Sequence, residues 1–148
     1  MVLQIYRAAH WLHRRNVPLL PRALYVLNRI LFGIALPPSA QIGRNVVLGY
    51  KGLGIVIHRR AVIGNGVNIG PRVTIGGRSG YAEVPVIEDD VMIGTGACIL
   101  GPVRIGRNAQ IGANAVVLCN VPPDGVAVGV PARVVKIGGH SIAQPLES

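Results

Sequence analysis

Residues 57–117 read IHRRAVIGNGVNIGPRVTIGGRSGYAEVPVIEDDVMIGTGACILGPVRIGRNAQIGANAVV, and an aliphatic residue returns in this stretch at every sixth position except Tyr81. Ile57, Ile63, Ile69 and Ile75 share one frame, which resumes at Ile87 and runs to Val117 after an interval of two hexads. A period of six fits neither a helix nor a long alternating strand, and it is a signature of a parallel β-helix. The stretch therefore predicts an all-β solenoid of hexapeptide repeats.

The expected coil has three flat sides, so that three hexads close one turn. The aliphatic residue at the first position of each hexad points to the axis and stacks on its equivalent in the next coil. The fifth position is always small or β-branched, from Ala61 and Val67 to Ala109 and Ala115. Glycine often follows the aliphatic residue, and we expect it there because a tight turn needs backbone angles that only glycine adopts freely. These positions are Gly43, Gly64, Gly70, Gly76, Gly94, Gly106 and Gly112.

The 148 residues fit one domain with three segments. Residues 1–36 form an N-terminal helical cap, with an amphipathic helix over 2–15 and a second helix that begins at Pro21 and stops at Gly33. Residues 37–136 form the β-helix, and residues 137–148 form a flexible tail. Two departures from the hexad pattern, at residues 50–54 and 76–86, predict loops that stand off the coil and shape a site.

The charge is strongly basic, with a formal net value of +9. This predicts an anionic partner, which can be nucleic acid, anionic lipid or a phosphorylated small molecule. Aromatic and basic residues do not alternate as they do where bases stack, so nucleic acid ranks last. Residues 1–36 hold five arginines and no acidic residue. These helices either associate weakly with a membrane surface or simply cap the solenoid or pack on a neighbouring subunit.

Cys98 and Cys119 show no metal-ligand spacing, and we expect both to be reduced in a cytoplasmic protein. The chain opens with no pattern typical of a signal peptide, and no apolar stretch is long enough to span a membrane. The solenoid also lacks the three histidines that a catalytic zinc site of the carbonic anhydrase kind requires. No metal is expected.

Several motifs resemble the hexapeptide-repeat acyltransferases, and above all the catalytic half of serine acetyltransferases and related polysaccharide O-acetyltransferases. They are GIVIH at 54–58, VTIGG at 73–77, VMIGTGACILG at 91–101, IGANAVV at 111–117 and GVPARVV at 129–135. The resemblance implies a left-handed β-helix, a homotrimer, and acetyl-CoA bound as co-substrate in the groove between neighbouring helices. It also implies that Gly76 and Gly77 border the thioester, that Thr95 and Ala113 line the groove, and that Arg133 meets the phosphates of CoA.

The chain departs from serine acetyltransferases at the acceptor site. Where that family has an Asp-His pair before GIV, this chain has Leu48, Gly49 and Tyr50. The second family His corresponds to Val84, the Arg before it to Glu83, and an upstream Asp to Ala35. The acceptor hydroxyl can therefore belong to an amino acid such as serine or to a sugar of a surface polysaccharide.

In the family a His acts as general base on the acceptor hydroxyl while backbone N–H groups stabilise the oxyanion. His58 is the only histidine inside the solenoid and is our first candidate for the base, with a surface corner residue as the alternative. Glu83 is the second candidate, and Tyr50 is a candidate to orient the acceptor. A different class of function is also open: because the Asp-His pair is missing, the chain can be a non-catalytic trimeric scaffold.

Overall fold

The computed structural model describes residues 1–146 of the chain. Within this part, strands β1 to β12 wind into four coils, and each coil gives one strand to each of three sheets, in which these twelve strands pair parallel. The first sheet contains β1 (Gln41–Ile42), β4 (Val62–Ile63), β7 (Val86–Ile87) and β10 (Arg104–Ile105). The second contains β2 (Val47–Leu48), β5 (Asn68–Ile69), β8 (Met92–Ile93) and β11 (Gln110–Ile111), followed by β13 (Gly125–Gly129), β14 (Ala132–Ile137) and β15 (His140–Leu146). The third contains β3 (Val56–Ile57), β6 (Thr74–Gly76), β9 (Cys98–Leu100) and β12 (Val116–Val117).

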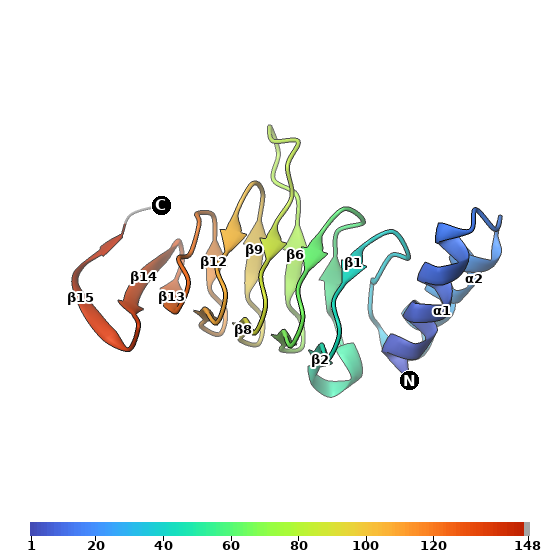
Figure 1. Cartoon of the computed structure of the whole chain (residues 1–148), viewed down its shortest axis with the longest axis horizontal. Coiled ribbons are helices and arrows are strands. Elements are labelled where there is room, and N and C mark those ends of the chain that lie inside the picture. The colour runs from blue at the N-terminus through green and yellow to red at the C-terminus, as the bar shows by residue number, and fades with distance from the viewer. Residues whose placement is uncertain (147–148) are drawn as a thin grey trace.

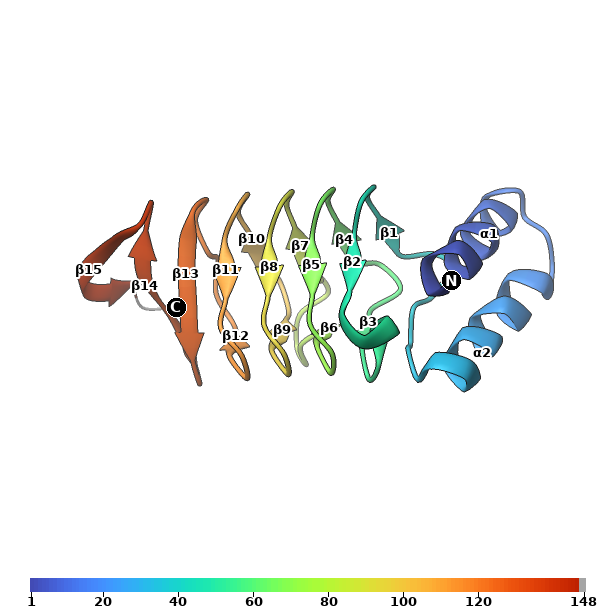
Figure 2. The ribbon, with the colours of Figure 1, turned by 90° about the horizontal axis from the view of Figure 1, so that it is seen from below.

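The chain passes from the first sheet to the second, then to the third, and back to the first one coil further along. The two views in Figures 1 and 2 show that this winding is left-handed. It departs from the right-handed rule for parallel crossovers. The predicted fold is confirmed.

The core is a set of stacked aliphatic ladders. In the third sheet Ile57 pairs with Ile75, Ile75 with Ile99, and Ile99 with Val117. These four side chains are at most 2% exposed. Full burial of one such side chain is worth roughly 1.5–3 kcal/mol. The sixfold periodicity thus marks the residues that hold each coil on the next.

The glycines after the aliphatic positions have a different cause from the one predicted. Gly64, Gly94 and Gly106 do not adopt positive φ, but an added Cβ would lie 2.8 Å from Asp89 N, 2.6 Å from Ala113 N and 2.4 Å from Pro123 N, respectively. Backbone of the next coil fills this space. Positive φ instead falls two positions later, as at Gly66 (67°) and Asn114 (57°). Close stacking of coils, not the turn angle, excludes a side chain after most of the aliphatic residues.

Two segments project from the coil, as the sequence predicts. A short 3-10 helix, η1 (Gly49–Gly52), follows β2, and residues 77–85 form a loop between β6 and β7. In Figure 1 the loop stands above the coils and η1 lies on the opposite side. The two departures from the hexad therefore mark different corners of the prism.

The N-terminal helices are α1 (Val2–Arg14) and α2 (Leu20–Phe32), and α1 closes the open end of the solenoid. The Tyr6 hydroxyl donates to Ala40 O at 2.5 Å, Arg7 Nη1 donates to Ile42 O at 2.7 Å, and His10 Nδ1 lies 2.7 Å from Pro38 O. Burial raises the pKa of Tyr6 to about 12, so this hydroxyl keeps its proton. In this position α1 supplies partners to carbonyls beside the terminal strand, as a cap does.

The C-terminal end differs from the prediction. The sequence predicts a flexible tail from residue 137, whereas residues 140–146 form β15, which pairs antiparallel with β14. Backbone pairing along the free edge of β14 needs few apolar side chains, which is why composition did not reveal it. Over the part of the chain that the structure describes, no helix is long and apolar enough to cross a membrane.

Candidate active site

The predicted site residues gather at two of the three corners of the prism. We call the corner after the third sheet the loop corner, and it carries His58, Gly76, Gly77 and the loop with Glu83. The corner after the second sheet, which we call the stacked corner, carries the other predicted residues of the coil: Tyr50, Thr95 and Ala113. The third sheet separates the two corners, so His58 and Tyr50 do not share one site within a single chain.

His58 is half-buried at the end of β3, directly beside the base of the loop. A Cβ added to Gly77 would lie 3.9 Å from His58 Cδ2. His58 Nδ1 accepts a hydrogen bond from the Arg60 backbone N–H at 3.1 Å. In the neutral ring one nitrogen is a donor and the other an acceptor, so Nδ1 carries the lone pair and Nε2 the proton. The basic atom of His58 is therefore Nδ1.

Burial lowers the pKa of His58, and the positive charges of Arg60 and Arg59 lower it further. Each of these effects disfavours the imidazolium. The ring is therefore neutral at pH 7 and has a lone pair available to accept a proton.

The loop is tied to the coil beside His58. The Arg60 guanidinium donates to Ala82 O, and the Arg78 guanidinium lies 5.2 Å from the centre of the Tyr81 ring. Glu83 is exposed and follows the residue that Arg60 holds. The structure thus brings His58, Gly77 and the loop together and places Glu83 at their margin.

Arg60 and Arg78 are the residues that our sequence analysis missed. Arg60 binds a carbonyl that lies 22 residues further along the chain, and Arg78 packs over the Tyr81 ring. The spacing of the hexads contains no signal for either contact. The only hint is the basic run of Arg59 and Arg60 after His58.

Replacing Arg60 by Ala should loosen this loop. A hydrogen bond from a charged donor contributes about 1.5 kcal/mol or more, so we expect amide hydrogen exchange in residues 77–85 to accelerate about tenfold. Hydrogen-exchange mass spectrometry measures this, with Arg44→Ala, an exposed arginine of the first coil, as the matched control. Equal exchange in both variants would contradict the role of Arg60.

The stacked corner forms a column of small residues along the axis. Thr95 and Ala113 are exposed and lie in successive coils, where the Asn114 N–H donates to Thr95 O at 2.8 Å. Tyr50 is 82% exposed and lies at the same corner in the first coil. Arg133 lies on β14 opposite Val128, beyond the last coil. The column therefore consists of exposed backbone and small side chains, and the guanidinium of Arg133 lies beyond its last coil.

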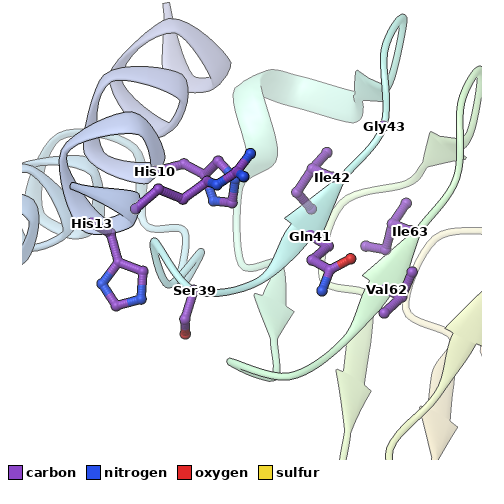
Figure 3. A pocket seen from close by; sticks show the side chains of 9 residues that line it. His10, His13, Ser39, Gln41, Ile42, Gly43, Val62 and Ile63 are labelled. Carbon is purple, nitrogen blue, oxygen red and sulfur yellow. The ribbon is translucent and has the colours of Figure 1, made fainter. Parts of the chain in front are cut away.

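A cavity of about 590 Å³ lies away from the residues predicted for catalysis and CoA (Figure 3). It is lined by α1 and by β1 and β4, and includes His10, His13, Ser39 and Gln41. His10 meets Pro38 O and so serves the cap. In the described residues, no group of three His, Cys, Asp or Glu could hold a metal ion.

Residues 85–119 match the family described as bacterial transferase hexapeptide (six repeats). That stretch carries the hexapeptide repeat of this family. The chain is 39% identical over 148 residues to a serine acetyltransferase of Synechococcus elongatus, covering 98% of this chain and 59% of that protein. It is 45% identical over 144 residues to a serine acetyltransferase of Mycobacterium tuberculosis, covering 96% of this chain and 62% of that one.

Solved serine acetyltransferases also share the fold of this chain. A soybean serine acetyltransferase complexed with serine superposes with a TM-score of 0.86 at 41% identity, over 90% of this chain and 56% of the soybean chain. The serine acetyltransferase of Brucella abortus in complex with coenzyme A superposes with a TM-score of 0.88 at 33% identity, over 94% of this chain and 56% of the Brucella chain. The chain spans about half to two thirds of the length of the curated relatives it matches.

Proposed function

We propose that this protein is an acetyl-CoA-dependent O-acetyltransferase that acetylates the hydroxyl of a small acceptor, with L-serine as the first candidate. The observation that carries the proposal is the pairing of a neutral His58 with the loop base at Gly77, in a chain similar to serine acetyltransferases over nearly its whole length. A non-catalytic scaffold would not need a solvent-accessible imidazole held in one tautomer.

His58 acts as the general base in this proposal. The acceptor O–H replaces the Arg60 N–H at His58 Nδ1, and the ring takes the proton as the oxygen attacks the thioester carbonyl carbon. The carbon–sulfur bond then breaks, and the leaving thiolate of CoA recovers the proton from His58. Backbone N–H groups near Gly76 and Gly77 stabilise the oxyanion.

Two corners that lie apart in one chain form one site if two copies pack side by side. We therefore assign the loop corner of one copy and the stacked corner of its neighbour to a single groove in a homotrimer. Thr95 and Ala113 line the CoA chain there, and Arg133 meets the phosphates, since its planar fork suits phosphate oxygens. Glu83 and Tyr50 border the acceptor.

Cys98 and Cys119 are both thiols, in keeping with a cytoplasmic location.

A mixing experiment tests the shared site. His58→Ala removes the base, and Thr95→Arg blocks the stacked corner, so each variant alone should be inactive. Mixed and reassembled trimers should regain activity in about a quarter of their sites, because random pairing places two intact corners together that often. Inactive mixtures of properly assembled trimers would contradict a groove built from two copies.

The acceptor is tested by release of the CoA thiol with L-serine, with a panel of sugars, and with no acceptor. Release above the control with serine supports the first candidate. A sugar hydroxyl is the second candidate, favoured by Tyr50, Glu83 and Val84 at positions where the serine site of the family has other residues. No release with any acceptor would overturn the enzymatic proposal.

The pH profile should depend on the charge beside His58. Arg59 lowers the pKa of His58, so Arg59→Gln should raise it and shift the acid limb of kcat/KM to higher pH. The limb should lie below pH 6.5 in the unchanged protein, because the pKa of His58 is lowered. Arg44→Gln, in the first coil, is the control. An acid limb that Arg59→Gln leaves in place or moves to lower pH would argue against His58 as the titrating base.

A further inference from the structure

The outer face of α2 is apolar and has no partner within the described residues. Its exposed side chains are Ile30 (75%), Leu31 (58%), Leu20 (48%), Val26 (42%) and Leu27 (41%). At 3.6 residues per turn they form one continuous stripe. The opposite side of the helix is buried, where the Asn28 side-chain N–H donates to Val2 O at 3.1 Å. The stripe thus faces away from α1.

Positive charge borders this stripe. Arg22 and Arg29 are exposed on α2. Directly after α1, the Arg15 guanidinium lies 4.1 Å from the centre of the Trp11 ring. Trp11 is 53% exposed. The first acidic residue of the whole chain is Glu83, so no carboxylate in the two helices or the first coil offsets these arginines.

A second copy is a poor occupant for this face. Packing two such helices on each other would bring arginines together without an acidic partner. A helix of 13 residues is about 20 Å long, and its stripe offers a few hundred Å², so the stripe alone falls short of the roughly 800 Å² per partner of a stable interface. An anionic lipid surface instead matches both features, because it accepts apolar side chains below the headgroups and attracts arginine.

We propose that α1 and α2 hold the protein on an anionic membrane surface, with the stripe of α2 inserted among the lipids. Trp11 lies at the headgroup level, where its indole suits the polar boundary. Both helices lie at the end of the solenoid, and α2 is the outermost element there (Figures 1 and 2). The loop corner and the stacked corner therefore stay open to solvent.

Flotation with vesicles tests this proposal on the full chain. Vesicles of phosphatidylcholine with phosphatidylserine should carry the protein upward, whereas phosphatidylcholine alone should not, and added salt should weaken binding. Ile30→Gln combined with Leu31→Gln should reduce binding tenfold or more. The matched control is Val47→Gln with Met92→Gln, two exposed apolar residues of the solenoid that should leave binding unchanged.

Sedimentation of the same variants separates lipid from protein occupants. The proposal predicts that Ile30→Gln with Leu31→Gln keeps the oligomeric state of the unchanged protein. A loss of subunits in this variant, or an unchanged protein that does not float with anionic vesicles, would overturn it. Equal flotation by the α2 variant and the solenoid control would do the same.

Discussion

Replacing His58 by Ala is expected to lower kcat by about 10²-fold or more, because a positioned general base contributes that much to proton transfer. The side chain is half-buried at a corner, outside the stacked core, so the variant should fold normally. Steady-state release of CoA thiol measures the loss, and circular dichroism checks the fold. His13→Ala, an exposed histidine of α1, is the control and should keep full activity.

His58→Gln then separates two ways in which this ring can act. A glutamine donates a hydrogen bond but takes no proton near neutral pH, so a base role predicts that this variant is as inactive as His58→Ala. If His58 acted only through Nε2–H as a donor, the glutamine variant would keep much of its activity and the acid limb of the pH profile would be absent. Full activity in a folded His58→Ala variant would remove the residue from the mechanism.

Replacing Gly94 by Ala should destabilise the protein by about 2–3 kcal/mol, the upper part of the roughly 1–3 kcal/mol typical of overpacking, because the surrounding backbone atoms have no room to move. The new Cβ would lie 2.6 Å from Ala113 N and 2.9 Å from Ile111 O, both backbone atoms of the next coil. Because Gly94 does not have positive φ, torsional strain adds nothing to this loss. Urea denaturation followed by circular dichroism measures the change in the free energy of unfolding.

Gly76→Ala is the matched control for this prediction. Gly76 has the same hexad position, but its nearest neighbours would be side-chain atoms, Leu100 Cδ2 at 3.5 Å and Thr74 Cγ2 at 3.6 Å. We expect its stability to change by less than about 1 kcal/mol, because these are ordinary contacts and Ala makes the unfolded chain less flexible than Gly does, which slightly favours the folded state. Equal destabilisation of both variants would mean that coil spacing does not exclude the side chain.

The fold was predictable because it depends on a repeated local rule. Each first-position aliphatic residue meets its equivalent in the next coil, so the period alone places Ile57, Ile75 and Ile99 in one ladder. The reason for the glycines was not predictable in the same way. Whether a Cβ fits at Gly94 or Gly76 depends on what the next coil places there, and this is a property of the stack.

The site was predictable in part, for a related reason. His58 and the loop are separated in the sequence by about the number of residues in one coil. Residues separated by one coil lie next to each other in the stack, so the fold brings His58 and the loop together. The bond from Arg60 to Ala82, the tautomer of His58 and the separation of Tyr50 onto another corner depend on side-chain geometry, which the hexad pattern does not encode. The strand at residues 140–146 escaped prediction because backbone pairing holds it.

The closures at the two ends of the coil determine whether this chain stays separate or joins other chains end to end. A hexad repeat contains no stop signal, and each exposed strand edge is a template on which another chain can continue the sheet. Here Tyr6, Arg7 and His10 meet backbone at the first coil, while β14 and β15 leave the parallel pattern at the last. These closures occupy the strand edges at both ends of the coil, so other chains cannot extend the sheets there. They limit a repeat that could otherwise assemble into a filament to a fixed number of coils.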